Sequence, residues 1–377
     1  MHRYILFLIL PLLSGCCSGT NAQENRSSFK PGELWPDNKG VHINAHGGGM
    51  LYHDGTYYWF GEYKSDHSND AQVGVTCYSS TDLYNWTNRG VALSVVDDST
   101  SDIVKGCIIE RPKVVYNEKT KTFVLFFHLE LKYRGYDAAR VGIAVSESVT
   151  GPYRFIRSYR PNAGLWPANL PEQERTINQS KQPEPESWTP EWLKAVEDGL
   201  FVKRDLFGGQ MSRDMTVFVD DNGKAYHIYS SEENLTLNIA ELSDDYLSHT
   251  GRYIRVAPAG HNEAPAIFKK DSTYFMITSG CTGWEPNAAR LHIARDIMGP
   301  WTQLENPWKG EGASISFDSQ STFIFKVQGK KDAWIFMADR WRPNHPSDGR
   351  YVWVPIEFEK GLPVLNWKDE WSLSVFD

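Results

Sequence analysis

Short runs that mix aromatic, β-branched and polar residues occur throughout the chain, and each lies next to a polar turn. Five of these runs are TYYWFGE, TFVLFFH, AYHIYSS, TYFMITSG and AWIFMADR. A turn rich in Asp, Asn, Gly and Lys precedes each run, and another short apolar run, such as PKVVY or PAIF, precedes the turn. Short runs of this composition bounded by turn residues are typical of β-strands. The body of the chain is therefore predicted to consist of β-hairpins.

The hairpins belong to a larger unit that repeats five times. A further strand follows each aromatic run, and several units then close on a turn with an aromatic residue, as in SSTDLYNW, SESVTGPY and ARDIMGPW. The units start near residues 41, 107, 213, 261 and 318. Four strands per repeated unit are typical of β-propeller blades. We therefore predict an all-β fold, a five-bladed β-propeller that forms one domain over residues 26–377. A β-sandwich with similar hairpins is the alternative.

One segment breaks the repeat. Residues 157–207 are predicted to be an insertion between blades two and three. Its first part is rich in Pro and Glu, and TPEWLKAVEDGL predicts a short helix that begins at Thr189 and Pro190, because Thr caps helices and Pro suits their first turn. Long ordered insertions often carry function. Two interpretations stand equally: the insertion covers one rim of the propeller, or it has no role in substrate binding.

The N-terminus has the features of an export signal. MHRYILFLILPLLSGC combines a short basic start with an apolar run that is too short to span a bilayer. The run ends in Leu-Ser-Gly-Cys, which resembles a bacterial lipobox, so cleavage would leave Cys16 as a lipidated N-terminus; an ordinary secretory signal is the alternative. Residues 1–25 are thus predicted to be a signal peptide and tether. The predicted location is the bacterial cell envelope, in the periplasm or at the outer-membrane surface, with the lipid at Cys16 as the only membrane contact.

Composition narrows the class of partner. Aromatic residues make up 13% of the chain, with 14 Trp. Flat rings stack on sugar faces, although an aromatic-rich β core is the simpler explanation. The net charge is −8 and no basic stripe is present, which argues against nucleic acid as a partner. Outside the signal region, Cys77, Cys107 and Cys281 have no zinc-type spacing and imply no disulfide framework.

The run AHGGG at residues 45–49 raises the question of an esterase, because His-Gly-Gly-Gly can form an oxyanion hole. An α/β-hydrolase also needs a Gly-x-Ser-x-Gly elbow and alternating helices, and the sequence has neither. In a propeller the run falls in the innermost strand of blade one, where glycines let backbones approach closely. His46 would then point into the central funnel, either as a substrate contact or as a structural histidine.

Carboxylates and one amide lie at the starts of the predicted inner strands. The positions are Glu110 in IIERPKVVY, Asp214 in SRDMTVFV, Glu263 in HNEAPAIF and Gln320 in FDSQSTFIF, while Glu62 ends the second strand of blade one. Side chains at these positions face the central pocket of a propeller. Burial and like charges both raise a carboxyl pKa, and a glycosidase acid needs a raised pKa beside ionised partners. The pattern favours a glycosidase-type site.

Several blocks resemble glycoside hydrolase family 43, whose members are five-bladed propellers that act on plant glycans and invert the anomeric centre. SRDMTVFVDDNGKAYHIYSS, NEAPAIFKKDSTYFMITSG and GPW carry the likeness, which covers roughly residues 35–375. AHGGGMLYHDGTYYWFGE, ERPKVVYN, TGWEPN and ADRWRP are similar to the exo-β-1,3-galactanase branch. The resemblance implies Glu263 as general acid and Asp214 as the residue that tunes and orients it. It places further residues at positions similar to galactose-binding ones: Glu62, Glu110, Tyr136, Asn234 and Thr282, with Trp284 and Trp341 as stacking residues.

The resemblance also exposes a departure at the catalytic base. Common family members carry an Asp at the start of blade one, whereas this strand reads Asn44-Ala45-His46-Gly47. The galactanase branch lacks that Asp as well, and there a glutamine in blade five is thought to hold the nucleophilic water. Gln320 matches this glutamine. Since a neutral amide is a very poor base, we interpret Gln320 as the residue that positions the water, and as the base only by resemblance. Glu110 is the second candidate for the base.

The resemblance implies an inverting exo-β-1,3-galactosidase that releases galactose from β-1,3-galactan, the backbone of arabinogalactans. The alternatives are an α-L-arabinofuranosidase or β-xylosidase of the same fold, and a non-catalytic surface protein that binds glycans. The expected partner is a plant polysaccharide or oligosaccharide, and the expected state is a monomer. No cofactor or metal is expected: calcium lies at the axis of some family members, but no acidic cluster here has the spacing of a calcium loop.

Overall fold

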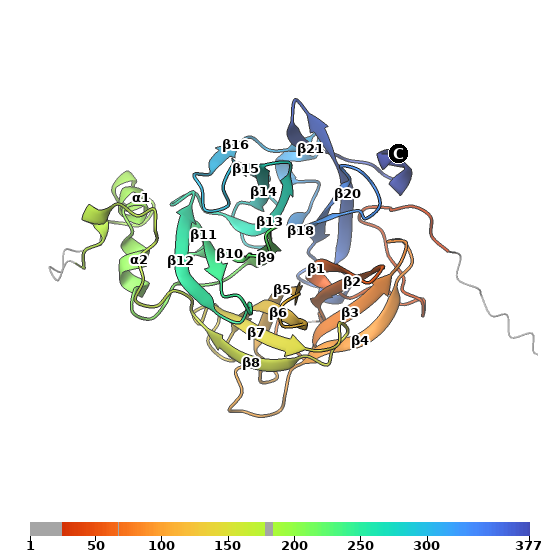
Figure 1. Cartoon of the computed structure of the whole chain (residues 1–377), viewed down its shortest axis with the longest axis horizontal. Coiled ribbons are helices and arrows are strands. Elements are labelled where there is room, and N and C mark those ends of the chain that lie inside the picture. Colours follow the sequence, from red (N-terminus) through yellow and green to blue (C-terminus); the bar gives the residue numbers. More distant parts are fainter. Residues whose placement is uncertain (1–24, 67, 178–183) are drawn as a thin grey trace, which may run out of the picture.

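The structure is a computed structural model and describes residues 25–66, 68–177 and 184–377. In this part of the chain the strands form five sheets around a central axis, as Figure 1 shows. The prediction of an all-β, five-bladed propeller is confirmed, and the β-sandwich alternative is wrong.

Each blade is an antiparallel meander that starts near its predicted position. Blades one and two comprise β1 (His46–His53), β2 (Thr56–Glu62), β3 (Gly74–Ser80), β4 (Thr87–Ser94), β5 (Ile108–Asn117), β6 (Thr122–Glu130), β7 (Arg140–Ser146) and β8 (Arg154–Tyr159). Blades three and four comprise β9 (Met215–Val219), β10 (Ala225–Ser231), β11 (Thr236–Leu242), β12 (His249–Val256), β13 (Glu263–Lys270), β14 (Thr273–Ser279), β15 (Arg290–Ala294) and β16 (Thr302–Leu304). Blade five comprises β18 (Gln320–Lys326), β19 (Trp334–Arg340), β20 (Arg350–Glu359) and β21 (Leu362–Asn366), with β17 (Trp308–Lys309) parallel to β21. The first strands β1, β5, β9, β13 and β18 contact one another around the axis.

Apolar side chains fill the space between neighbouring blades. Between blades one and five, Trp59 and Trp353 are fully buried with ring centroids 4.7 Å apart. Similar clusters separate the other pairs of blades. Because each sheet packs on both faces, its middle strands are apolar on both sides, which explains why runs such as TFVLFFH depart from strict alternation.

The two ends of the described chain meet beside blade five, where Figure 1 also places the C-terminus. Phe29 and Trp371 exchange backbone hydrogen bonds of 2.7 and 3.1 Å, and their rings stack with centroids 4.3 Å apart. The N-terminal segment is thus tied to the last residues of the chain.

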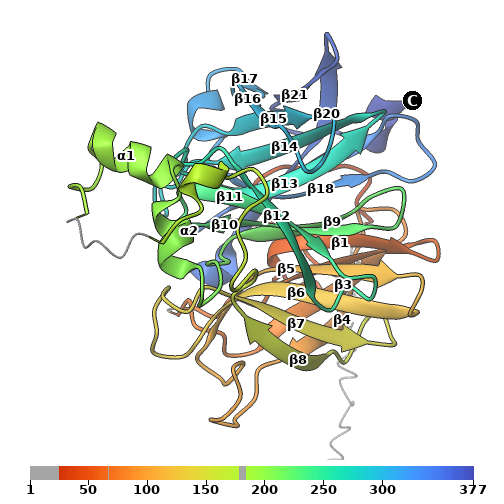
Figure 2. The same cartoon turned by 60° about the vertical axis from the view of Figure 1, so that its left-hand side comes forward.

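The segment between blades two and three leaves the ring after Tyr159, because residues 157–159 still belong to β8. It contains η1 (Glu172–Glu174), α1 (Pro190–Glu197) and α2 (Leu200–Asp205), and Figures 1 and 2 show both helices outside the ring, next to β12. The predicted helix start is confirmed, since Thr189 Oγ1 accepts a hydrogen bond from the Trp192 amide at 3.2 Å. We call residues 160–213 the insertion from here on.

The predicted signal peptide and Cys16 lie outside the described residues. Within the part of the chain that the structure does describe, no helix is both long and apolar enough to cross a bilayer.

Candidate active site

A cavity of about 540 Å³ lies where the inner strands begin. This size is typical of small-molecule sites. Every blade contributes to its wall, which contains Glu62, Lys64, Asn69, Ile108, Glu110, Arg111, Tyr136, Arg213, Asp214, Asn234, Glu263, Cys281, Gly283, Trp284, Gln320 and Trp341. We call it the central cavity.

The same local feature begins three of the inner strands. Strands β1, β5 and β13 each carry a β-bulge, which begins at His46, Glu110 and Glu263, respectively. In each strand the next residue has left-handed backbone: Gly47 (φ 57°), Arg111 (φ 54°) and Ala264 (φ 52°). Bulges re-aim side chains, and left-handed backbone at non-glycine residues is concentrated at functional sites. The bulges turn Glu110 and Glu263 toward the central cavity.

Glu263 is a half-buried carboxyl with several polar neighbours. Its Oε1 accepts hydrogen bonds from Asn234 Nδ2 at 2.7 Å and from the Cys281 thiol at 3.0 Å. Burial raises the pKa of Glu263 to about 7, and the negative charge of Asp214 acts in the same direction. The group can therefore carry a proton near neutral pH and give it to a bound molecule.

Arg111 links the charged groups of the cavity floor. Its Nη2 donates to Asp214 Oδ2 at 2.7 Å and to Gln320 Oε1 at 2.5 Å, and its backbone amide donates to Glu62 Oε1 at 2.8 Å. Arg111 lies under the Trp341 ring, 5.3 Å from the ring centroid. The guanidinium thus holds residues of blades three and five, and the backbone amide of the same residue holds Glu62 of blade one.

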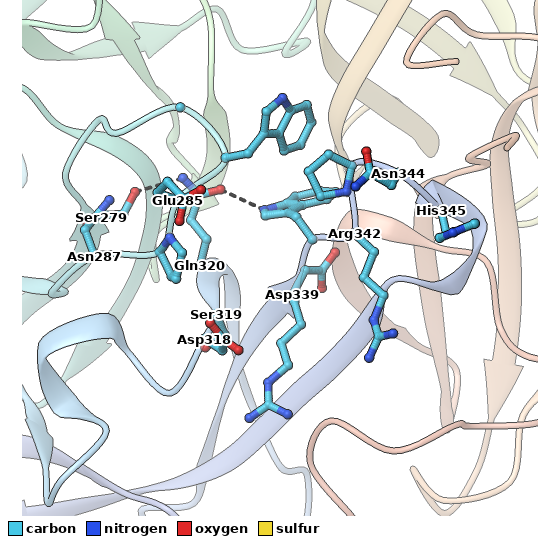
Figure 3. Close-up of a pocket in the computed structure, with 16 residues that line it drawn as sticks. Ser279, Glu285, Asn287, Asp318, Ser319, Gln320, Asp339, Arg342, Asn344 and His345 are labelled. Carbon is cyan, nitrogen blue, oxygen red and sulfur yellow. Dashed lines mark hydrogen bonds between the residues drawn. The ribbon is translucent and has the colours of Figure 1, made fainter. Parts of the chain in front are cut away.

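The orientation of the Gln320 amide follows from its partners. Its Oε1 accepts from Arg111 and from Trp341 Nε1 at 2.9 Å, and both groups can only donate. Its Nε2 donates to Ser279 Oγ at 2.9 Å (Figure 3). An amide oxygen that already accepts from a guanidinium is a poor proton acceptor. The geometry therefore favours Gln320 as a positioning residue over Gln320 as a base.

Gln320 also faces a second cavity of about 400 Å³. Figure 3 shows this space, with Asn287 and Asp318 near Gln320 and with Arg342 and His345 farther away. Trp284 and Trp341 contribute to the walls of both cavities.

Glu110 is held as an ionised carboxylate. It accepts from Tyr136 OH at 2.7 Å and from Asn69 Nδ2 at 3.1 Å, while His128 Nδ1 lies 3.1 Å from its other oxygen. The second nitrogen of His128 lies 2.8 Å from Glu130. Burial alone would lower the pKa of His128, but the two carboxylates raise it to about 9, so the ring is an imidazolium at neutral pH. Burial alone would also raise the pKa of Glu110, but this imidazolium holds it below its usual range.

Comparison with known proteins agrees with this geometry. The family model described as glycosyl hydrolases family 43 matches residues 179–369. A solved β-1,3-galactosidase of the same family, in complex with galactodeoxynojirimycin, is 57% identical, with a TM-score of 0.90, over 92% of this chain and 100% of that one. The chain belongs to glycosyl hydrolase family 43. The predicted family is thus confirmed, and the protein is a glycoside hydrolase.

Other family 43 structures are similar over the same part of the chain. An exo-β-1,3-galactanase from Phanerochaete chrysosporium, with β-1,3-galactotriose, is 30% identical (TM-score 0.74; 92% of this chain, 68% of that one). The exo-β-1,3-galactanase from Clostridium thermocellum is 34% identical (TM-score 0.74; 92% and 66%). The comparison with curated proteins returned no match.

One group in this family 43 site has the composition of a metal site. Ligand atoms of Glu110, His128 and Asp214 all lie within 4.8 Å of one another. However, both nitrogens of His128 face carboxylates and carry protons, so the ring offers no lone pair to a metal. The set does not suit a cation, and the expectation of no cofactor stays a prediction.

The structure brings most of the predicted site residues together. Those that line the central cavity are Glu62, Glu110, Tyr136, Asp214, Asn234, Glu263, Trp284, Gln320 and Trp341. Thr282 does not line it: its hydroxyl donates to the Glu285 carbonyl and accepts from Asn287 Nδ2. In that loop the neighbouring Cys281 faces the cavity instead.

The prediction that His46 points into the funnel is wrong. Its ring is fully buried and stacks on Tyr351, with centroids 5.3 Å apart. Neither ring nitrogen has a hydrogen-bond partner among the described residues, and burial lowers its pKa to about 3. The ring is therefore neutral, and in this structure it cannot contact a sugar in the central cavity.

Several polar residues of the site were not expected from the sequence. Lys64 forms a buried ion pair with Glu62 at 2.7 Å and donates to Asn69 at 2.6 Å. Arg111 and Cys281 directly follow or precede residues that were singled out, which is the only signal the sequence carries for them. His128 lies in the apolar run TFVLFFH, where a buried histidine has no distinguishing pattern.

Proposed function

We propose that this protein is an inverting exo-β-1,3-galactosidase that releases galactose from β-1,3-galactan, the backbone of arabinogalactans. The observation that carries the proposal is the 57% identity, over 100% of its chain, to a β-1,3-galactosidase that binds galactodeoxynojirimycin. Galactanases that are 30 and 34% identical support the same substrate class.

In the proposed mechanism Glu263 is the general acid. Its proton moves to the glycosidic oxygen as the bond from C1 to that oxygen breaks. Burial and the charge of Asp214 keep the proton on Glu263 until then. Asn234 and Cys281 hold the carboxyl in place through Oε1.

A water molecule attacks C1 from the opposite side and inverts the anomeric centre. Gln320 positions this water, because its amide orientation is fixed by Arg111, Trp341 and Ser279. We assign the proton that the water loses to Glu110, an ionised carboxylate that lines the cavity. Its three hydrogen-bond donors make Glu110 a weak base. A weak base is enough here, because the oxocarbenium-like centre itself attracts the water.

The general acid is tested by Glu263→Gln on β-1,3-galactobiose. The amide keeps the size of the side chain but has no acidic proton, so we expect turnover to fall by about 10²–10⁴-fold, the typical contribution of general acid catalysis. Circular dichroism and urea unfolding show whether the fold is kept. A folded variant with full turnover would overturn the assignment.

The products and a panel of substrates separate the proposal from its alternatives. Proton NMR of galactan hydrolysis, read before mutarotation, should show α-galactose first; β-galactose first would contradict inversion. Turnover of aryl α-L-arabinofuranosides or β-xylosides, without turnover of galactobiose, would favour the other sugars. Binding of galactan with no product at all would favour a non-catalytic protein.

We further propose that the protein is exported and carries a lipid at Cys16. Support comes from the lipobox-like Leu-Ser-Gly-Cys after a short apolar run. Metabolic labelling with palmitate should mark the full-length chain and not its Cys16→Ala variant. Equal labelling of both would contradict the anchor.

A further inference from the structure

The general acid Glu263 is contacted by a turn with unusual backbone geometry. Glu232, Glu233 and Asn234, between β10 and β11, all have positive φ, at 53°, 56° and 65°. Three consecutive non-glycine residues in the left-handed region are strained and persist only where surrounding contacts hold them. This turn places Asn234 Nδ2 2.7 Å from Glu263 Oε1. We call residues 232–234 the left-handed turn.

A buried ion pair holds the first residue of the left-handed turn. Arg255 Nε and Nη2 donate to the two oxygens of Glu232, each at 2.7 Å. Glu232 is fully buried and Arg255 is 5% exposed. A bidentate pair fixes both the distance and the angle between its partners, so it sets the direction of the turn as well as its position.

The insertion satisfies the rest of the Arg255 guanidinium. Nη1 donates to the Glu197 carbonyl at 2.7 Å and Nη2 to the Val196 carbonyl at 2.6 Å, both at the C-terminal end of α1. Carbonyls at this end of a helix have no partner within the helix, so they can accept from outside it; that of Val196 also accepts from the Gly199 amide at 3.0 Å. The guanidinium is thus clamped between the insertion and the left-handed turn.

Three further contacts join the insertion to the same turn or to the residue directly after it. Glu233 pairs with Arg204 of α2 at 2.9 Å and with Arg213 at 3.0 Å. Leu235, directly after the turn, packs in one cluster with Trp192, Val196 and Phe201 of the insertion.

We propose that the insertion is a brace for the general acid: α1, through Arg255 and Glu232, holds the left-handed turn so that Asn234 keeps Glu263 in its working orientation. Arg255 and Glu232 are then positioning residues that never touch the sugar. The proposal rests on the assigned role of Glu263 and gives the insertion a catalytic purpose.

The test uses Arg255→Lys in the full-length protein, with Asp220→Asn as control. Lysine keeps the charge but cannot span Glu232 and both carbonyls of α1. Asp220 is also a buried carboxylate of blade three, bound to Lys269 at 2.6 Å, but it lies after β9, at the other end of the blade from Asp214. The control therefore disturbs an ion pair that blade three makes with blade four, without disturbing the brace.

We expect kcat on β-1,3-galactobiose to fall about tenfold or more in Arg255→Lys, a part of the ~10²–10⁴ that general acid catalysis supplies. An N–H donor stabilises an ionised carboxyl, so a displaced Asn234 raises the pKa of Glu263. The alkaline limb of the kcat/KM profile then moves to higher pH. The other groups that face Glu263 are unchanged in the variant: Glu110 and Arg111 of blade two, Asp214 of blade three and Cys281 of blade four. Asp220→Asn should leave both kcat and the pH of the alkaline limb unchanged.

The proposal is overturned if folded Arg255→Lys keeps kcat within about twofold of the wild-type value and its alkaline limb at the wild-type pH. It is also overturned if this variant loses no more kcat than the control Asp220→Asn. Should Arg255→Lys fail to fold, Glu232→Gln, which keeps shape and loses only charge, is judged by the same criteria. If the wild-type protein does not hydrolyse galactobiose, the proposed function fails instead. The two failures are therefore distinguishable.

Discussion

At the scale of single residues, the proton on Glu263 is controlled by neighbours with opposite effects. Burial and the negative charge of Asp214 raise its pKa to about 7, whereas the Cys281 hydrogen bond and the charge of Arg111 lower it. Each of these neighbours can be changed separately, so the pH profile of the enzyme reports on each of them.

The first prediction concerns Asp214. Because a general acid must be protonated, kcat/KM of the wild-type enzyme should fall as the pH rises through about 7. Asp214→Asn removes a negative charge, which lowers the pKa of Glu263, so the alkaline limb should move to lower pH. Rates on galactobiose between pH 5 and about 9 measure it. An unmoved limb in the variant would show that Asp214 does not tune the acid.

The second prediction concerns Cys281. Burial raises the pKa of its thiol to about 12, so the group is a protonated donor at neutral pH, 3.0 Å from Glu263 Oε1. Cys281→Ala removes the donor, and the alkaline limb should move to higher pH. Cys281→Ser keeps a donor at the same place and is the control, whose limb should not rise. A rise of equal size in both variants would assign the shift to altered packing.

Residue-level prediction from sequence worked where a side chain directly precedes or begins an inner strand. Glu263 and Asp214 could be found in this way because every inner strand begins at the central cavity. His46 occupies the same bulge position in β1 but is buried, since blade five covers it: a Cβ on Gly349 would lie 2.3 Å from its ring. No local pattern reveals a contact between residues 303 positions apart.

At the scale of elements, the glycine run of β1 leaves space for groups of other residues that lie close to the strand. The glycines were expected to allow close approach of backbones at the axis. A Cβ on Gly48 would indeed lie 2.1 Å from the Phe60 carbonyl, but the neighbours of Gly47 and Gly49 are side chains, Glu62 Oε1 at 2.2 Å and Lys113 Cδ at 2.5 Å. The run makes room for charged groups under the central cavity.

The third prediction follows from this run. Gly47→Ala places a Cβ at positive φ and against Glu62, which the Arg111 amide binds at 2.8 Å. We expect it to lower the free energy of unfolding by more than the ~1–2 kcal/mol of left-handed strain alone, and to impair turnover. Gly55→Ala is the matched control, since it has φ 77° and open space around the added Cβ. Urea unfolding of both variants measures the difference. Equal losses of unfolding free energy would mean that the Glu62 side chain moves away from the added Cβ at no cost.

The insertion shows the limit of element-level prediction. The start of α1 could be predicted because Thr189 and Pro190 act within the first turn of the helix. The contact made by the end of α1 could not be predicted, because Arg255 binds the α1 carbonyls from 58 and 59 residues away in the chain. Local signals determine where a helix begins, and only the folded ring determines what it touches.

At the scale of the whole molecule, the ring itself builds the site. Arg111 and Gln320 are 209 residues apart in the chain and 2.5 Å apart in space. The five-fold repeat could be predicted from the sequence because each blade repeats the same strand and turn pattern. The hydrogen bonds between residues of different blades could not be predicted, since they form only when the five blades close into a ring.

The last prediction concerns that closure. Phe29 is 1% exposed, stacks on Trp371 and lies 4.7 Å from the Tyr84 ring of blade one, so it joins the two ends of the chain to the first blade. Phe29→Ala should lower the free energy of unfolding by about 3–5 kcal/mol, the usual cost of removing a buried aromatic ring. Leu34, in the same segment, is 50% exposed, and Leu34→Ala should change the free energy by no more than about 0.5 kcal/mol.

Urea unfolding followed by tryptophan fluorescence measures both variants, and turnover of galactobiose by the folded fraction should be unchanged in each. Because the blades share cores with their neighbours, loss of one contact at the closure should weaken the whole ring in a single transition. If Phe29→Ala were as stable as Leu34→Ala, the ring would be closed by the packing between blades one and five, such as Trp59 on Trp353, without help from Phe29. If it instead unfolded in two steps, blade five would be separable from the other four, and the cavity, which needs Gln320 and Trp341, would be lost in the first step.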